Sequence, residues 1–305
     1  MMTIIAYIAY LMPLVMIYII LAQSLGLSAG YAGLVSLSHA AFFGIGAYSA
    51  AILSVEHGFS FLIILPTTLL ITGIIALIIS TISFRTIDEY FVVITLGIQV
   101  VFKSILNNFE GLTYGPMGIS GIPPVTIFGY VIESNNIFLV LCIIFVLITW
   151  LILHNIGNSR FGLILVSLSE DEIFVQSLGK NVRKAKAISF TISAMLASIA
   201  GILNAYYYGV IYPSNFSIEE SIFILSIVII GGMKNFSRIA LFALFLVLLP
   251  EGLRFIGFHC EFQANIQQII YGVILILVIF DPTIIKDMKR NISNLFRSLI
   301  PIYNS

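Results

Sequence analysis

Charged side chains are scarce in this chain. Only 9% of its 305 residues are Asp, Glu, Lys or Arg, whereas 60% are hydrophobic. Soluble domains carry roughly 25% charged residues, because polar side chains must cover their surface. The composition therefore excludes an ordinary soluble fold and predicts a protein that is dissolved in lipid.

Cysteine and catalytic motifs are also scarce. The two cysteines, Cys142 in an apolar run and Cys260 in a polar break, argue against a disulfide framework or a thiolate metal site. A phosphate-binding loop ending at Gly179-Lys180 would need glycine where Phe174 stands, and the chain contains no His-Glu-x-x-His or Cys-x-x-Cys motif. We predict no catalytic residue, no metal site and no cofactor held by the chain itself.

The apolar residues fall into long runs. A bilayer core about 30 Å thick is crossed by about 20 apolar residues in a helix. Candidate spans are 4–24, 34–53, 61–83, 90–106, 137–154, 187–208, 219–231, 238–257 and 264–280. None shows the alternation of a barrel strand, and two are short enough to be half-helices. We predict an all-α, polytopic bundle of about 8–10 transmembrane helices.

The distribution of charge predicts the orientation. Basic residues concentrate in 155–186 and after 281, so both stretches should face the cytoplasm, and the predicted outer loops are acidic. On this count the N-terminus is external. We expect a transmembrane domain over 1–280. The basic, amphipathic tail over 281–305 could lie on anionic lipid or touch a partner.

The second apolar run follows a stretch that should break the helix. Gly26, Gly30 and Gly33 weaken it, and a titratable side chain at membrane depth makes the next run a candidate pathway. The alternative is that this histidine only fixes helix packing. The candidate pathway residues are His39, Phe42, Phe43, Gly44 and Tyr48.

The predicted outer loop 113–124 is rich in glycine and proline, which specify tight turns. It could gate a pore, dock an external partner or serve as a rigid connector. The residues concerned are Gly115, Pro116, Gly118, Gly121 and Pro123.

The long polar stretch 155–186 predicts a short capped helix. Ser169 and Glu172 have the spacing of a capping box, and Gly179 suits a left-handed stop. Such a helix is suited to a groove on another protein. The residues assigned to this surface are Ser169, Glu170, Asp171, Glu172, Ile173, Phe174, Leu178 and Gly179.

Small residues recur at every fourth position of the next run, and this spacing predicts a face for close helix packing. They are Ser189, Ser193, Ala197, Gly201 and Ala205.

Taken together and in this order, these motifs resemble the M-type permease subunits of branched-chain amino acid ABC importers. The likeness covers roughly residues 24–255. It includes Gly30 to Tyr48, Tyr90-Phe91 through Thr95-Leu96, Asn107-Asn108, the loop 113–123, Glu170-Asp171-Glu172, Leu178-Gly179, Lys186 and Ile230-Gly231-Gly232. The chain departs from the family pattern at Pro116 and at the bulky run Ile173, Phe174 and Val175.

The resemblance implies a type II ABC importer permease-like fold in the bacterial cytoplasmic (inner) membrane, with solute moved by alternating access. The chain would pair with a second homologous permease, two cytoplasmic ATP-binding subunits that use the ATP, an extracytoplasmic solute-binding protein and membrane lipid, and not with nucleic acid. Residues 169–179 would contact the ATPases. The expected solutes are branched-chain amino acids, with urea or short amides as alternatives within the family. A secondary carrier or an intramembrane enzyme would be the alternatives outside it.

Overall fold

The computed structural model describes residues 2–84, 88–127, 129–255 and 272. The chain divides into two compact units, Met1–Leu248 and Leu249–Ser305. Apart from residue 272, the described part of the second unit is the end of the last helix. Except for residue 272, the predicted span 264–280 and the predicted tail 281–305 lie outside the described residues, so neither is tested.

The described chain is almost entirely helical. The main helices are α1 (Met2–Leu25), α2 (His39–Val55), α3 (Phe61–Ser83), α4 (Asp88–Asn108), α6 (Asn135–Gly157), α9 (Val182–Tyr208), α10 (Ile218–Gly231) and α11 (Phe236–Phe255). Six helical stretches are long and apolar enough to cross a membrane, and α2 and Phe236–Pro250 are shorter apolar helices. The prediction of an all-α polytopic membrane protein is confirmed.

The outward faces of α3, α4 and α6 are apolar. Large side chains such as Leu70, Val93 and Ile144 are exposed along these helices. Contiguous apolar surface of this extent would be costly in water and is stable against lipid or another membrane helix.

Helix α9 forms the centre of the first unit and packs against α1, α2 and α3. The predicted small-residue face is buried along its whole length. A Cβ atom on Gly201 would overlap the Phe43 carbonyl oxygen, and one on Gly46 would overlap the Ser198 carbonyl oxygen. The backbones of α2 and α9 therefore touch at two reciprocal glycines.

The predicted span 34–53 is wrong at its start. Helix α1 continues into a π-helical turn, η1 (Gly26–Tyr31), and α2 begins only at His39. Gly33 has a φ of 71°, which ends the helix, and the backbone of 34–38 that follows is not helical. The Leu37 amide donates to Thr95 Oγ1 at 3.1 Å, so this buried non-helical stretch is partly satisfied by protein.

The predicted outer loop is more than a series of turns. It begins at the last residue of α5 (Glu110–Thr113) and contains η2 (Gly115–Met117) and β1 (Ile119–Ser120). Strand β1 pairs antiparallel with β4 (Val210–Ile211), which precedes η3 (Pro213–Asn215), and β2 (Val125–Ile127) pairs with β3 (Tyr130–Ile132). A Cβ atom on Gly118 would overlap the Ile211 carbonyl oxygen. The loop is thus attached to the chain between α9 and α10.

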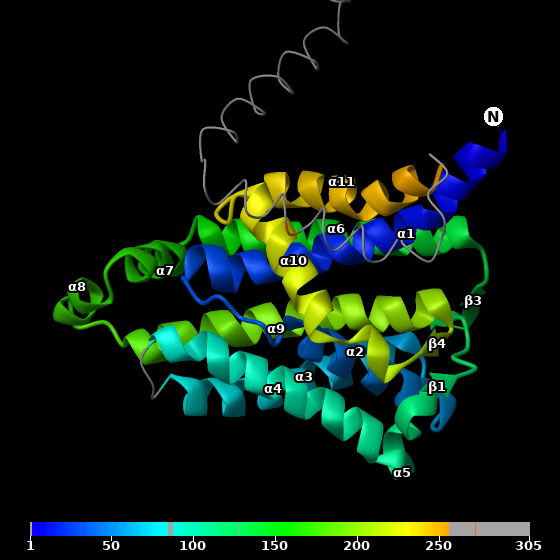
Figure 1. Cartoon of the computed structure of the whole chain (residues 1–305), viewed down its shortest axis with the longest axis horizontal. Coiled ribbons are helices and arrows are strands. Elements are labelled where there is room, and N and C mark those ends of the chain that lie inside the picture. The colour runs from blue at the N-terminus through cyan, green and yellow to red at the C-terminus, as the bar shows by residue number, and fades with distance from the viewer. Residues whose placement is uncertain (1, 85–87, 128, 256–271, 273–305) are drawn as a thin grey trace, which may run out of the picture. The chain divides into compact units, whose positions relative to one another are not determined.

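The short strands and the polar stretch 155–186 lie at opposite ends of the first unit. Figure 1 shows α7 (Arg160–Glu170) and α8 (Glu172–Ser177) at one end and β1, β3 and β4 at the other. The Tyr207 hydroxyl donates to the Tyr10 carbonyl at 3.0 Å, which places the start of α1 near the strands. This is the arrangement that an external N-terminus requires, and the orientation in the membrane stays a prediction.

The close approach of α2 and α9 predicts a large effect of one methyl group. We expect Gly201→Ala to lower stability by about 1–3 kcal/mol, because the methyl group would press on the α2 backbone. The measurement is the midpoint of thermal denaturation of the detergent-solubilised protein, monitored by fluorescence-detected size-exclusion chromatography. The control is Gly97→Ala in α4, where a Cβ atom meets nothing within 4 Å. Equal midpoints for the two variants would contradict this account.

Candidate functional site

Three polar side chains cap the helices of the polar stretch 155–186. The Ser159 hydroxyl accepts from the Gly162 amide at 3.2 Å, Asp171 Oδ1 from the Phe174 amide at 2.9 Å, and Asn181 Oδ1 from the Lys184 amide at 3.0 Å. The predicted capping box at Ser169 is wrong. Ser169 lies inside α7 and donates to the Val166 carbonyl at 2.7 Å, so Asp171 is the cap of α8.

Helix α8 directs its apolar side chains away from the rest of the chain. Ile173, Phe174 and Leu178 are 80%, 55% and 61% exposed, whereas Val175 is buried beneath them. Gly179 has a φ of 72° and ends the helix as predicted. Three exposed apolar side chains thus lie on and directly after this short helix at the end of the unit.

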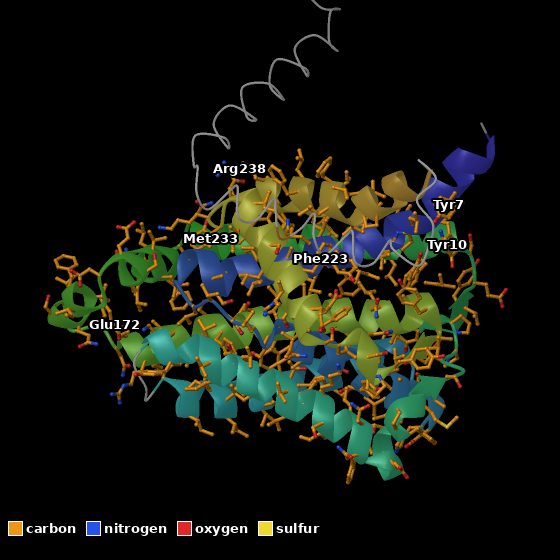
Figure 2. All side chains as sticks on the ribbon, viewed as in Figure 1. Tyr7, Tyr10, Glu172, Phe223, Met233 and Arg238 are labelled. Atoms are coloured by element: carbon orange, nitrogen blue, oxygen red, sulfur yellow. The ribbon has the colours of Figure 1, made fainter. Side chains whose placement is uncertain are left out.

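An ion pair joins α8 to the first turns of α9. Lys186 Nζ lies 2.6 Å from Glu172 Oε2, and the lysine side chain is only 4% exposed. Figure 2 places Glu172 at the α8 end of the unit, with Tyr7 and Tyr10 at the opposite end. This charge-assisted contact with a buried lysine ties α8 to the first turns of α9.

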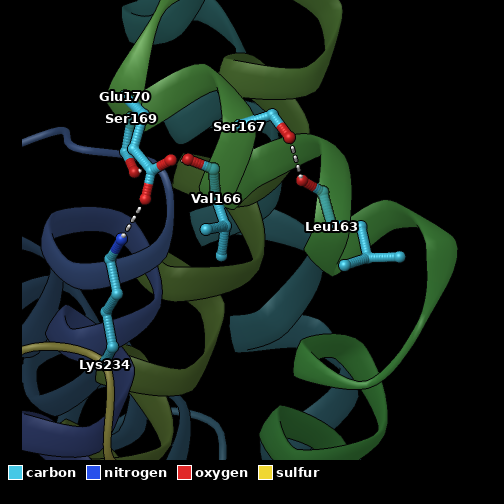
Figure 3. Close-up of polar contacts among 6 residues, drawn as sticks. All are labelled: Leu163, Val166, Ser167, Ser169, Glu170 and Lys234. Carbon is cyan, nitrogen blue, oxygen red and sulfur yellow. Dashed lines mark hydrogen bonds and ion pairs between the residues drawn. The ribbon is translucent and has the colours of Figure 1, made fainter.

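The end of α7 contacts the break between α1 and α2. A Cβ atom on Gly33 would lie 3.2 Å from that of Ser169, and one on Gly30 would overlap the Met233 carbonyl oxygen. Glu170 Oε1 receives the Lys234 ammonium at 3.4 Å, an exposed pair shown in Figure 3. Ser169 and Glu170, which are predicted to contact the ATPases, therefore adjoin both the non-helical segment between η1 and α2 and the turn between α10 and α11.

The predicted pathway residues do not form one surface. His39 is 1% exposed, and its Nε2 lies 2.8 Å from Ser24 Oγ, so it ties α2 to α1. Phe42 is buried against Phe190. A Cβ atom on Gly44 would contact Phe102 and Phe216, the ring of which is also beside Tyr48. Of the five, Phe43 lines a cavity. Their role in transport stays a prediction.

That cavity lies near the strand end of the unit and has a volume of about 420 Å³. Small-molecule sites commonly enclose roughly 300–1,000 Å³. It is lined by Tyr18, Phe43, Asn204, Tyr208, Val210, Tyr212, Asn215 and Glu220. Helix α9 supplies Asn204 and Tyr208, so the helix that is tied to α8 at its first turns forms a cavity wall near its end.

Phe43 is the one lining residue among the predicted site residues, and the other seven were not predicted. Asn204 was distinguishable in the sequence as a polar residue beside the small-residue face, and Glu220 as an acidic residue in an outer loop. Neither signal reveals a cavity, because the lining comes from α1, α2, α9, the segment 210–215 and α10.

One sequence pattern resembles a hydrolase nucleophile turn but lacks its structure. Gly26-Leu27-Ser28-Ala29-Gly30 fits Gly-x-Ser-x-Gly, which in hydrolases follows a strand and exposes the serine. Here it lies in a π-helical turn after α1. Ser28 is fully buried, donates to the Leu25 carbonyl at 3.2 Å and accepts from Ser193 Oγ at 3.3 Å. This serine therefore contributes to the packing of the η1 turn against α9.

The apolar helices are those of a multi-pass membrane protein, and the cavity is large enough for a small solute. The comparison with known families agrees. Residues 7–279 match the family described as branched-chain amino acid transport system / permease component, and the chain belongs to that family.

Individual relatives support the assignment. The chain is 31% identical over 300 residues to the high-affinity branched-chain amino acid transport system permease protein LivM of Escherichia coli K12, covering 91% of this chain and 69% of LivM. Identity is 30% to LivM of Salmonella typhimurium, covering 90% and 69%, and 25% to a probable permease LivH of Methanocaldococcus jannaschii, covering 63% and 58%. No solved structure matches the chain.

The ion pair between α8 and α9 can be tested by stability. We expect Glu172→Gln to destabilise the protein by roughly 1.5–3 kcal/mol, because it removes a charged partner of a buried ammonium. The control is Glu170→Gln, whose partner Lys234 is half-exposed and should matter little. Thermal midpoints of the two solubilised variants are the measurement, and a larger loss for Glu170→Gln would refute this ranking.

Proposed function

We propose that this chain is a membrane-spanning permease subunit of an ATP-binding-cassette importer and forms the translocation path for branched-chain amino acids. Membership in the permease family supports the transporter role, and the names of the LivM relatives support the solute class. The subunit acts without a catalytic site or cofactor of its own. ATP is used by partner subunits, and the assembly resides in the bacterial cytoplasmic (inner) membrane.

The observation that carries the mechanism is the course of α9. This helix has 27 residues, and at 1.5 Å per residue it is about 40 Å long. Lys186 near its start is paired to α8, and Asn204 and Tyr208 near its end line the cavity. A displacement of α8 therefore reaches the cavity wall through one continuous helix, without a relay of loops.

Alternating access requires an element with two positions whose balance is biased by another subunit. Helix α8 fits this requirement on its cytoplasmic side, because its exposed apolar side chains would enter a groove on an ATPase. Closure of the two ATPases would push α8, shift α9 and the broken segment, and change which end of the cavity is open. A second homologous permease would complete the path, and an extracytoplasmic binding protein would deliver the solute.

The composition of the assembly is the first test of this function. Purification of the tagged chain in mild detergent should recover a second permease and two ATPases, identified by mass spectrometry. A chain that purifies alone and moves leucine into liposomes without ATP would be a secondary carrier. Uptake of urea or a short amide with no uptake of leucine would assign the alternative substrate.

The docking role of α8 predicts which substitutions release the ATPases. We expect Phe174→Asp to reduce recovery of the ATPases at least about tenfold, because a carboxylate would have to be buried in an apolar groove. Met117→Asp is the control, since Met117 is 83% exposed at the opposite end. Its recovery of ATPases should match the wild type. Undiminished ATPase recovery with Phe174→Asp would disprove docking through this helix.

A further inference from the structure

We infer that the cavity beside α9 is a binding site for solutes that carry a primary ammonium group, and that Glu220 is the residue that binds this group. The role of this site in transport rests on the proposed function, whereas the preference for an ammonium group is argued from the residues of the cavity. Among the described residues that line the cavity there is no lysine or arginine, and Glu220 is the one charged side chain.

Glu220 is placed differently from an ordinary acidic residue at the start of a helix. Acidic side chains in a first turn are common, because they complement the helix dipole, and Glu219 is exposed in this way. Glu220 instead turns inward to the cavity and is hydrogen-bonded by Tyr18. Its Oε1 is enclosed and has no hydrogen-bond partner among the described residues.

An enclosed carboxylate oxygen without a partner is costly, and a cation with N–H donors relieves that cost. An ammonium group supplies three donors and a positive charge in one compact group. A neutral amide such as urea supplies donors without the charge, so Glu220 favours ammonium-bearing solutes over the amides that other members of this class could carry.

The remaining lining suits the rest of an amino acid. Asn204, which is 4% exposed, and Asn215 lie on the walls and offer amide donors for a carboxylate. Phe43 and Val210 form an apolar wall for a branched side chain. With one negative charge and neutral donors, the cavity matches a zwitterion whose ammonium group carries the electrostatic recognition.

The matched control is the neighbouring carboxylate. Glu219 belongs to a different hollow, which is lined by Lys103, Asn107 and Ser104 among others. Substitution of either glutamate by glutamine removes the same charge from adjacent positions of α10, but only one of them touches the cavity beside α9.

The test places a single thiol in the cavity and needs no partner subunit. In a full-length background with Cys142→Ala and Cys260→Ala, Asn215→Cys introduces the thiol at an exposed lining residue. Cationic and anionic methanethiosulfonates of similar size are then compared in membrane vesicles. We expect the cationic reagent to react about tenfold faster, after correction for its rate with a free thiol, because the carboxylate concentrates cations.

Glu220→Gln should abolish this preference and Glu219→Gln should leave it unchanged. With Glu220 intact, isopentylamine and leucine should slow the labelling. Isocaproate, which has the carbon skeleton of leucine but no ammonium group, should not slow it. Protection by isocaproate, or a charge preference that survives Glu220→Gln, would overturn the inference. Glu220→Asp, which keeps the charge, should retain most of the preference and shows that the effect is not caused by misfolding.

Transport provides the second measurement. In the reconstituted assembly, Glu220→Gln should lower leucine uptake about tenfold, the same factor as the lost charge preference, while ATPase recovery stays at the wild-type level. Equal uptake by the Glu220→Gln and Glu219→Gln variants would reject a role in transport. Absence of ATPases in the wild-type preparation would instead refute the proposed importer. The labelling result would still show whether Glu220 binds an ammonium group.

Discussion

The structure depends on the close contact between α2 and α9. Glycines at positions 46 and 201 let the two backbones touch, which bulkier side chains would prevent. Hydrogen bonding reinforces the same core, because Ser193 Oγ donates to the Ser24 carbonyl and lies 3.3 Å from Ser28 Oγ. In lipid, where apolar burial gives little driving force between helices, such packing and buried hydrogen bonds hold a bundle together. Helix α9 is the common partner of α1, α2 and α3 because of this contact.

A central α9 has a functional consequence. One end is tied to α8 by the pair of Lys186 and Glu172, and the other forms a wall of the cavity with Asn204. The non-helical backbone between η1 and α2 sits beside the end of α7 and supports the same region. A helix buried on most of its surface transmits a displacement as a rigid body, because its neighbours leave it no room to bend. In the proposed mechanism, α9 is therefore the element that connects the polar end to the cavity.

Much of this architecture could be predicted from local patterns. The runs at 61–83, 137–154 and 219–231 match α3, α6 and α10 closely, since long apolar runs have one stable conformation in lipid. One error arises where two local solutions compete, and another where a distant contact decides. Ser169 and Asp171 both fit a cap, and the side chain of Asp171 reaches the Phe174 amide. The start of α2 is set by a bond from Leu37 to Thr95, 58 residues away, which no local window contains.

The sequence by itself determined the solvent, the helical class, the small-residue face of α9 and the capped polar segment, because composition and helical periodicity act over a few residues. Only the tertiary structure decided that His39 is packed while Phe43 lines a cavity, and that Glu220 faces inward while Glu219 does not. These outcomes depend on which helices meet. A cavity built from segments between Tyr18 and Glu220 exists only after those segments have come together.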